Sequence, residues 1–340
     1  MEKREKILTK SLFNMSQNVC IVDIETTGLS KYKDSIICIG IIYRHEEDFK
    51  LIQWFAHTLS EECNILSEFL SFASNFEKIY TYGGNKFDIP FLTYRLSYHD
   101  LNNTIYKKLK FSDISKLGLL SYKNKHELEK CLTYKRKVSL AGKDVVKLYN
   151  AYQRDNNSNY KDLILAHNLD ELMLFLCGFQ IYILFKKLSS QILDIKTDYS
   201  LTRTQYTLVL DNPIICSYNF IKDPITILLE KDKNECIVSI TPSKLCLKKY
   251  LHPIKDYFYI PSQNQLIHKS IASFISKDLK EKATKENCFI LKEDYFIRAY
   301  EKKRNDNNVW YDENNSRYIL YSDFVKSHNI VDYMMSLCHS

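Results

Sequence analysis

The first half of the chain begins with a series of apolar runs separated by short polar breaks. Residues 18–24 and 35–43 are rich in Ile, Val and Cys, and the apolar run at 49–55 follows a polar turn at 45–48. β-Branched runs of this length, bounded by turn residues, are typical of strands. Because the connections between them are short, we expect the three strands to form an antiparallel meander.

Helical spacing of apolar residues follows the third strand. It starts at Ser60, which is followed by two glutamates, and continues to Phe76. Residues 78–82 then predict a fourth strand. From there to residue 187 the pattern is predominantly helical, most clearly at 145–152 and 163–185. This order of strands and helices predicts an α/β domain.

The pattern changes near residue 195, where we place a domain boundary between residues 1–195 and 196–340. The second domain is expected to be a β-rich α+β domain. We also expect a helix at 262–278, a short strand pair around Phe289 and Tyr295, and a terminal helix from Ser322. The other expected strands are at residues 206–210, 214–220, 225–229, 236–240 and 257–260.

The composition is that of an ordinary globular protein. A chain of 340 residues with 45% hydrophobic and 26% charged residues is long enough for two domains. The net charge of +7 favours a polyanionic partner, but only mildly. Ten cysteines without a Cys-x-x-Cys pair indicate reduced thiols, so we expect a cytoplasmic protein. The apolar run at 172–185 is shorter than the roughly 20 residues that span a bilayer, and a buried helix is expected instead.

Two acids stand at the end of the first strand. Asp23 and Glu25 are one residue apart, so they point to the same face of the strand while Ile24 packs on the other face. Neighbouring carboxylates repel each other, and a divalent cation can offset the cost of burying them. Oxygen ligands suit Mg²⁺ or Mn²⁺. The alternative is an edge strand with one solvated face, but the continuously apolar run before Asp23 argues against it.

Two later motifs also carry acids. Asp88 follows the fourth strand where a helix is expected, and there it can serve as a helix cap or as part of a site beyond the strand end. His167 lies three and four residues before Asp170 and Glu171 in a helical run, so a base and a carboxylate share one helix face. Capping, and an exposed polar turn, would explain these two motifs when each is taken alone. Only their combination with the first acidic pair indicates a site.

In this order and setting the three motifs resemble those of the DEDD (DnaQ-like) 3′–5′ exonucleases of the RNase H-like superfamily. The first is Asp-Ile-Glu-Thr-Thr-Gly-Leu at 23–29, the second is Asn-Lys-Phe-Asp-Ile-Pro-Phe-Leu at 85–92, and the third is His-Asn-Leu-Asp-Glu-Leu at 167–172. The third is most similar to the YprB-like branch, in which His-Asn precedes an acid within a helix. The resemblance covers roughly residues 18–190 and implies a mixed sheet flanked by helices.

The resemblance also implies hydrolysis of phosphodiester bonds with two bound cations, Mg²⁺ or Mn²⁺, and His167 as the base. The fourth acid is either Glu171, at the spacing from the histidine that is usual in the branch, or Asp170, which has the usual residue type; the spacing favours Glu171. The other implied metal ligands are Asp23, Glu25 and Asp88. The residues expected to contact the terminal nucleotide are Thr26, Thr27, Leu29 and Asn85.

The expected partner is RNA or DNA with a single-stranded 3′ end. Basic clusters at 248–249, 280–285 and 302–304 have Tyr and Phe residues between them, which predicts that the second domain captures substrate. Two other interpretations stay open. The irregular third motif is compatible with a catalytically impaired nucleic-acid-binding module. The 25 tyrosines are compatible with a protein-interaction scaffold.

Overall fold

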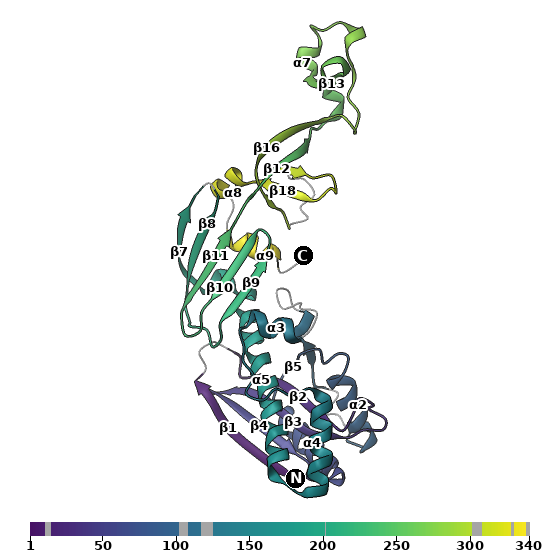
Figure 1. The fold of residues 1–340 in the computed structure, drawn as a ribbon, viewed down its shortest axis with the longest axis vertical. Coiled ribbons are helices and arrows are strands. Elements are labelled where there is room, and N and C mark those ends of the chain that lie inside the picture. Colours follow the sequence, from purple (N-terminus) through teal and green to yellow (C-terminus); the bar gives the residue numbers. More distant parts are fainter. Residues whose placement is uncertain are drawn as a thin grey trace. The chain divides into compact units, whose positions relative to one another are not determined.

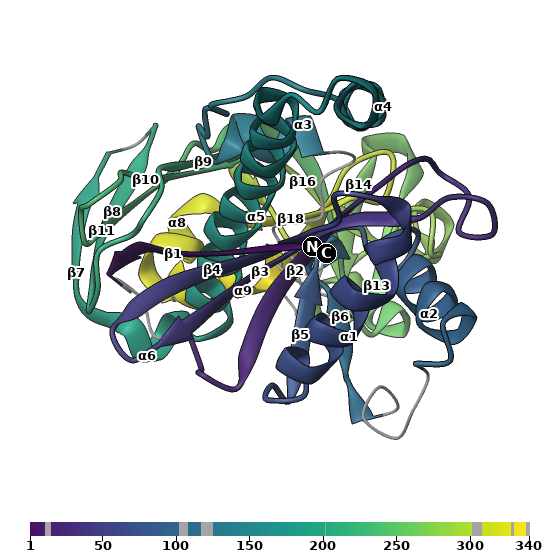
Figure 2. The ribbon, with the colours of Figure 1, turned by 90° about the horizontal axis from the view of Figure 1, so that it is seen from below.

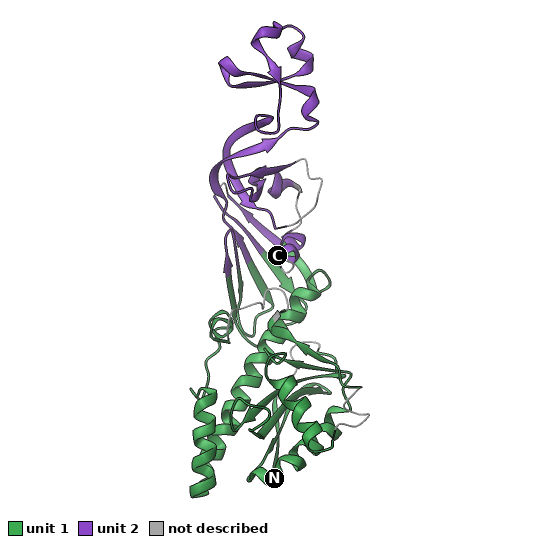
Figure 3. Ribbon diagram, turned by 90° about the vertical axis from the view of Figure 1, so that its right-hand side faces the viewer, with its two compact units in different colours: residues 1–195, 207–220, 227–237 green, residues 196–206, 221–226, 238–340 purple. Residues whose placement is uncertain are grey.

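The structure is a computed structural model that describes residues 1–10, 15–101, 108–116, 125–200, 202–300, 308–327 and 330–337. The chain forms two compact units, shown in Figure 3. Unit 1 comprises residues 1–195, 207–220 and 227–237, and unit 2 comprises residues 196–206, 221–226 and 238–340. The chain therefore passes between the two units several times after residue 195.

Unit 1 contains a six-stranded mixed sheet (Figures 1 and 2). Its strands are β1 (Glu2–Lys10), β2 (Val19–Thr26), β3 (Ile36–His45), β4 (Asp48–Phe55), β5 (Lys78–Thr81) and β6 (Phe111–Asp113). They lie in the order β1-β4-β3-β2-β5-β6. The antiparallel pairing of β2, β3 and β4 confirms the expected meander, and β5 pairs parallel with β2. The edge strand β1 was not predicted, because it begins with five consecutive charged residues and gives no apolar run.

Helices cover both faces of this sheet, as Figure 2 shows. They are α1 (Glu62–Ala73), α2 (Asp88–Tyr98), α3 (Lys125–Cys131), α4 (Gly142–Asp155), α5 (Ser158–Lys186) and α6 (Leu188–Gln191), with 3₁₀ helices η1 (Leu59–Glu61) and η3 (Ile114–Lys116). One core joins the sheet to α1 and α2, and a second joins it to α4 and α5. Val22 and Ile24 of β2 belong to the first core. Asp23 and Glu25, with the opposite parity, therefore face the α5 side.

By length and composition alone, helix α5 could cross a membrane. However, 78% of its most apolar stretch is buried within the protein, and the helix packs on β2 and β3. A buried core helix of a globular domain can have the same length and composition. The helix extends the predicted range of 163–185 at its beginning, where Asn157 caps it by accepting a hydrogen bond from the backbone N–H of Asn159.

The later part of the chain is rich in strands, as expected. A five-stranded sheet has the order β7-β8-β11-β10-β9, a closed barrel contains β12, β16, β18 and β17, and a small sheet has the order β14-β13-β15. Their bounds are β7 (Ile192–Tyr199), β8 (Thr204–Leu210), β9 (Tyr218–Lys222), β10 (Ile225–Leu229), β11 (Glu235–Ile240), β12 (Ser243–Tyr250), β13 (Tyr257–Ile260), β14 (Gln265–His268), β15 (Glu281–Lys282), β16 (Phe289–Arg298), β17 (Val309–Tyr311) and β18 (Arg317–Leu320). The helices are η5 (Ile254–Asp256), η6 (Pro261–Gln263), α7 (Lys269–Ala272), η7 (Lys277–Leu279), α8 (Tyr321–Ser327) and α9 (Ile330–Leu337).

Two expected elements of this part are wrong. The segment 262–278 is not one helix, because Asn264 adopts a left-handed conformation with φ of 50° and the next four residues pair with β13. The expected strand pair around Phe289 and Tyr295 is a single strand, β16, which pairs with β12 over eight residues. A local hairpin with β13 replaces the expected helix in the first place, and pairing with the distant β12 extends the strand in the second. The terminal helix expected from Ser322 is confirmed, since α8 begins one residue earlier.

Candidate active site

A cavity of about 1030 Å³ in unit 1 brings together residues from β2, β6 and several helices. Its lining includes a group of acids, none of them more than 7% exposed. These are Asp23, Glu25, Asp88, Asp113 and Glu171. Buried carboxylates must be compensated by cations, hydrogen bonds or protonation. The cavity therefore gathers buried negative charge that needs such compensation.

The register of β2 and β3 places the first two acids. Asp23 pairs with Gly40 and Glu25 with Cys38, so both carboxylates leave the same face of the sheet. The missing side chain at Gly40 matters, because a Cβ there would lie 2.1 Å from Asn168 Oδ1. Gly40 thus lets helix α5 approach the strand that carries Asp23.

Asn168 fixes the position of Asp23. Its Nδ2 donates a hydrogen bond to Asp23 Oδ2 at 2.9 Å, and its Oδ1 accepts one from Gln53 Nε2 at 2.8 Å. Gln53 also donates to the backbone oxygen of Leu165 at 2.9 Å. Sequence reasoning missed Asn168 and Gln53 as site residues. Two features of the sequence could have indicated them: a glutamine inside an apolar strand, and an asparagine next to His167.

Asp88 enters the cavity as the first residue of α2. The preceding residue, Phe87, occupies the cap position and makes no side-chain cap hydrogen bond, so Asp88 is not the cap of this helix. The loop before it is held by Asp113, which accepts hydrogen bonds from the backbone N–H groups of Gly83 at 2.8 Å and Ser115 at 2.9 Å. Asp113 was not predicted, because it lies at the end of a three-residue strand with no recognisable motif.

Helix α5 supplies a histidine and the fourth acid of the predicted set. His167 is 4% exposed, and its Nε2 lies 3.8 Å from Glu25 Oε1 and 3.9 Å from Glu171 Oε1. Its Nδ1 is buried without a hydrogen-bond partner among the described residues. The third motif is thus a buried turn that faces the acids, not an exposed polar one.

Asp170 has a different environment from its neighbour Glu171. It accepts hydrogen bonds from the Tyr134 hydroxyl at 3.1 Å and from the backbone N–H groups of Lys137 at 2.7 Å and Val138 at 2.8 Å. Asp170 does not line the cavity, whereas Glu171 does. Its carboxylate holds the segment between α3 and α4 against α5.

Two cations contact Glu171. Lys125 Nζ lies 3.0 Å from Glu171 Oε2, and Arg136 Nη1 donates to Glu171 Oε1 at 2.6 Å. The Lys125 side chain is 42% exposed, but its ammonium lies inside the cavity mouth, where Glu171, Asp23 and Asp88 raise its pKa against the opposing effect of burial. No motif in the sequence pointed to either cation.

The acids of β2 and α2 hold their protons more tightly than free carboxylates. Burial raises the pKa of Asp23 and of Glu25 well above the usual range, and neighbouring carboxylates add to this effect while Lys125 opposes it. Burial likewise raises the pKa of Asp88 to about 6. The charge of Lys125 therefore does not fully compensate Asp23, Glu25 and Asp88.

The pKa values of the two groups on α5, His167 and Glu171, are lowered instead. Burial alone would raise the pKa of Glu171, but Lys125 and Arg136 hold it below its ordinary value. Burial lowers the pKa of His167, so its imidazole is neutral at neutral pH and can accept a proton.

The residues expected to contact a terminal nucleotide divide into two pairs. Thr26 and Leu29 line the cavity, and Leu29 is 88% exposed. Thr27 is not among the lining residues, and its Oγ1 accepts a hydrogen bond from the backbone N–H of Ser35 at 3.0 Å. Asn85 also lies outside the lining, and its backbone N–H donates to Asp113.

The donor chemistry of the cavity fits a hard divalent cation. Asp23, Glu25, Asp88 and Glu171 offer carboxylate oxygens, which are the ligands that Mg²⁺ and Mn²⁺ prefer. In the described part of the chain no three His, Cys, Asp or Glu side chains are close enough to hold one ion. Binding would therefore require the carboxylates to approach a shared cation.

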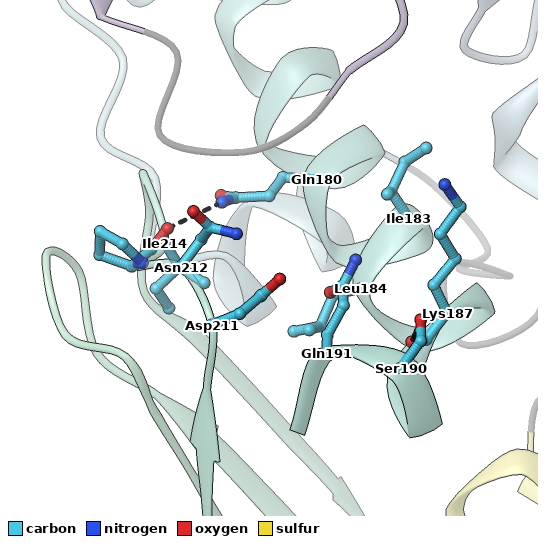
Figure 4. A pocket seen from close by; sticks show the side chains of 10 residues that line it. Gln180, Ile183, Leu184, Lys187, Ser190, Gln191, Asp211, Asn212 and Ile214 are labelled. Carbon is cyan, nitrogen blue, oxygen red and sulfur yellow. Dashed lines mark hydrogen bonds between the residues drawn. The ribbon is translucent and has the colours of Figure 1, made fainter. Parts of the chain in front are cut away.

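A second pocket of unit 1, of about 200 Å³, is less suited to chemistry (Figure 4). It lies between the end of α5, α6 and the loop around Pro213. Gln180 spans it, because its Oε1 accepts a hydrogen bond from the backbone N–H of Ile215 at 2.8 Å. Its charged lining residues are Lys187 and Asp211. A single acid and a single ammonium indicate a packing gap bridged by Gln180.

The basic clusters of the second half have different settings. Lys248 and Lys249 lie on β12, with their ammonium groups 4.8 Å and 5.7 Å from the ring centres of Phe289 and Trp310. Lys280 donates to the backbone oxygen of Ile275 at 2.6 Å and so has a local structural role. The cluster at 302–304 lies outside the described residues.

Comparison with known families gives one match that bears on the fold. Residues 20–175 match the model of the RNase_H superfamily family RNase_H_2. This range contains β2 to β6 and all five acids of the cavity. Residues 20–175 have an RNase H-like fold, with a mixed sheet flanked by helices, as the motifs predicted. No curated protein matches the chain in sequence.

Solved structures resemble the chain only distantly. One is the family B DNA polymerase of the hyperthermophilic archaeon Pyrobaculum calidifontis, with 11% identity and a TM-score of 0.42 over 96% of this chain and 46% of the polymerase. The chain thus spans about half the length of that protein. Another is the zinc-bound E. coli ExoI–single-stranded DNA complex, with 9% identity and a TM-score of 0.29 over 95% of this chain and 73% of the other. These low TM-scores leave the family match as the comparison that bears on the fold.

Proposed function

We propose that this protein is a metal-dependent nuclease that hydrolyses phosphodiester bonds, trimming RNA or DNA from a single-stranded 3′ end. The observation that carries the proposal is the cavity of the RNase H-like fold. There β2, α2 and α5 bring buried carboxylates together with a neutral histidine. Nuclease chemistry is consistent with this combination, because hard cations would relieve the excess negative charge of the cavity and could in turn hold the anionic phosphate of the substrate.

The proposed ligands are Asp23, Glu25, Asp88 and Glu171, which all line the cavity. Two bound cations would activate water and stabilise the leaving oxygen in the hydrolysis of the phosphodiester. The Asn168 amide would hold Asp23 in a fixed orientation while the other carboxylates adjust. Between the candidates for the fourth acid, we assign Glu171, since the hydrogen bonds of Asp170 are used by the segment 134–138.

His167 is the proposed base. Its Nε2 faces Glu25 and Glu171, and this atom would take the proton of the attacking water. The imidazolium that results lies between two carboxylates, which stabilise its charge. Thr26 and Leu29 at the cavity wall would contact the terminal nucleotide.

The test uses end-labelled RNA and DNA oligonucleotides with free or blocked 3′ ends, incubated with Mg²⁺, Mn²⁺ or EDTA. We expect stepwise shortening of the strands with free 3′ ends, in the presence of either cation and not in EDTA. Cleavage that is unaffected by EDTA would contradict the metal assignment. Shortening of blocked strands from the 5′ end would contradict the direction.

A second candidate function is favoured by one observation. Lys125 and Arg136 both contact Glu171, so the fourth acid already has positive partners. A catalytically impaired module that binds nucleic acid through this cavity would have such an arrangement. Salt-dependent binding of the oligonucleotides without cleavage in either cation would select this function over the nuclease.

A further inference from the structure

Helix α2 and the connection between β2 and β3 carry exposed aromatic side chains. Tyr32 is 65% exposed, Tyr98 is 61% exposed, and Tyr94 is partly exposed. The rings of Tyr32 and Tyr94 meet edge to face, with their centres 4.8 Å apart. Those of Tyr94 and Tyr98 are nearly parallel, with centres 6.5 Å apart. The three rings form one continuous aromatic surface, which we term the tyrosine platform.

Helix α2 connects the tyrosine platform to the acid cavity, with the buried Phe91 between them. Positions 87, 91, 94 and 98 are three or four residues apart, so their side chains share one face of the helix. Phe87, at the start of this stripe, lines the cavity, and its ring centre is 5.3 Å from that of Phe91. With a rise of about 1.5 Å per residue, Tyr98 lies roughly 15 Å along the helix from Asp88. That length corresponds to a few nucleotides of a single strand.

Positive charges accompany these rings. Lys31 Nζ lies 5.3 Å from the ring centre of Tyr32. Arg95 Cζ lies 4.3 Å from that of Tyr98, but its charge is paired with the buried Glu62. Lys33, in the same loop as Tyr32, and Lys86, at the cavity wall, are exposed. Exposed aromatic faces next to lysine side chains suit a partner that offers flat bases and anionic phosphates.

We propose that the tyrosine platform binds a single-stranded nucleic acid by stacking its bases, a few nucleotides upstream of the end that enters the acid cavity. The inference rests on the proposed function for the direction of the strand, but the binding itself can be measured without cleavage. Stacking on tyrosine is tolerant of sequence, because every base has an aromatic face. The platform would therefore favour long single strands over short ones without reading their sequence.

The experiment compares two oligonucleotides on the full chain in EDTA, where no divalent cation supports cleavage. Fluorescently labelled decathymidylate reaches the platform, whereas trithymidylate fills only the cavity. Binding is followed by fluorescence anisotropy. The double variant Tyr94→Leu/Tyr98→Leu should lower the affinity for decathymidylate about tenfold or more, and that for trithymidylate less than about twofold.

Two matched variants control this experiment. Tyr94→Phe/Tyr98→Phe keeps the rings and should bind both oligonucleotides like the wild type. Tyr199→Leu removes a tyrosine that is 52% exposed in the other unit and should likewise leave both affinities unchanged. Unfolding curves of all variants show whether the contact between Tyr98 and Arg95 matters for stability.

An abasic decamer tests the stacking directly. Removal of the bases outside the terminal three should weaken binding to the wild type as much as the leucine variants do, and should weaken the leucine variant no further. Unchanged binding of decathymidylate by the leucine variant would overturn the proposal and leave the platform free for a protein partner. Equal losses for both oligonucleotides would also overturn it. Failure of the nuclease proposal is seen separately, as absence of cleavage with Mg²⁺ or Mn²⁺ despite the predicted binding pattern.

Discussion

Unit 1 buries two groups of charged side chains that differ in how their charge is balanced. In the first, Glu62 is 1% exposed and accepts hydrogen bonds from the backbone N–H of Ile36 and from Arg95 Nε, both at 2.8 Å. His99 Nε2 lies 3.0 Å from the same carboxylate. In the second, the acid cavity, Lys125 and Arg136 both contact Glu171, whereas Asp23 and Asp88 form no ion pair with a lysine or arginine of the described residues. Both groups involve α2, whose first residue belongs to the cavity and whose Arg95 belongs to the first group.

The two groups also differ in their protonation. Although burial opposes it, hydrogen bonds from Arg95 and His99 lower the pKa of Glu62. In the cavity, burial and mutual repulsion raise the pKa of Asp23 and Glu25. A paired buried charge stabilises one conformation, whereas unpaired carboxylates store an unfavourable energy that a bound cation relieves. The first group is thus structural, and the second has the electrostatics of a binding site.

The largest expected effect comes from Asp23→Asn. The amide keeps an oxygen that can accept the hydrogen bond from Asn168, but it removes one charge from the cavity. We expect cleavage to fall roughly a thousandfold, and the free energy of unfolding in EDTA to stay the same or to rise. Rates with Mn²⁺ and urea unfolding measure the two quantities. A variant that cleaves like the wild type would end the nuclease assignment of this cavity.

For Glu62→Gln we expect a loss of stability, in contrast to Asp23→Asn. Arg95, whose side chain is 7% exposed, would lose its anionic partner, so the free energy of unfolding should fall by about 3–5 kcal/mol. Urea unfolding at pH 7 measures this loss. Glu68→Gln, an exposed position on the same helix, should change stability by less than about 0.5 kcal/mol. If both variants lose the same amount, the buried group is not the stabilising element inferred here.

The adjacent acids of α5 sharpen the same distinction within one helix turn. Glu171→Gln should lower the cleavage rate by roughly a hundredfold with little loss of stability, because Glu171 faces the cavity. Asp170→Asn should instead lower stability by about 1–3 kcal/mol, because its carboxylate accepts two backbone hydrogen bonds from residues 137 and 138. Parallel measurements of rate and unfolding assign each role. Reversed results would make Asp170 the fourth acid.

The sequence predicted the cavity better than it predicted what surrounds it. Strand alternation was sufficient to place Asp23 and Glu25 on one face, and helical spacing to place His167 and Glu171 on another. These are local relations, and motif order linked them. Asp88 was found in the same way, through its position after a strand.

The missing residues of the site were those that act across long sequence separations. Lys125 reaches Glu171, and Gln53 reaches Asn168, through contacts that no local pattern encodes. For the same reason the edge strand β1 and the long pairing of β12 with β16 were not predicted. Tertiary pairing decides such elements, and propensity is only a weak guide to them.

Lys125→Met tests whether the ammonium competes with a metal ion. Methionine keeps much of the side-chain volume and removes the charge that now contacts Glu171. We expect the affinity for Mn²⁺ to rise about fivefold to tenfold, measured by titration calorimetry without substrate. Lys143→Met, at another position of the cavity lining, should change this affinity much less. Equal or weaker Mn²⁺ binding by Lys125→Met would show that the ammonium does not occupy the metal's position.

The smallest effect expected is a pH dependence of opposite sign in the two buried groups. Because the pKa of Glu62 is lowered on folding, its contribution to stability is present above its ordinary value of 4.5 and is lost as the pH falls through its folded pKa. Burial raises the pKa of Asp88 to about 6, so between about pH 4 and pH 6 the folded state binds more protons, and stability falls as the pH rises.

Urea unfolding of three proteins in EDTA between pH 3 and pH 7 separates these contributions. Relative to the wild type, Glu62→Gln should lose less stability on acidification below about pH 4.5, whereas Asp88→Asn should gain stability as the pH rises from about 4 to 6. Each difference should be on the order of 1 kcal/mol. Saturating Mn²⁺ should remove the fall in wild-type stability between about pH 4 and pH 6, because a bound cation favours the ionised carboxylates. It should leave the difference between the wild type and Glu62→Gln unchanged. Curves that shift in the same direction for both variants would show that the two groups do not differ in charge balance.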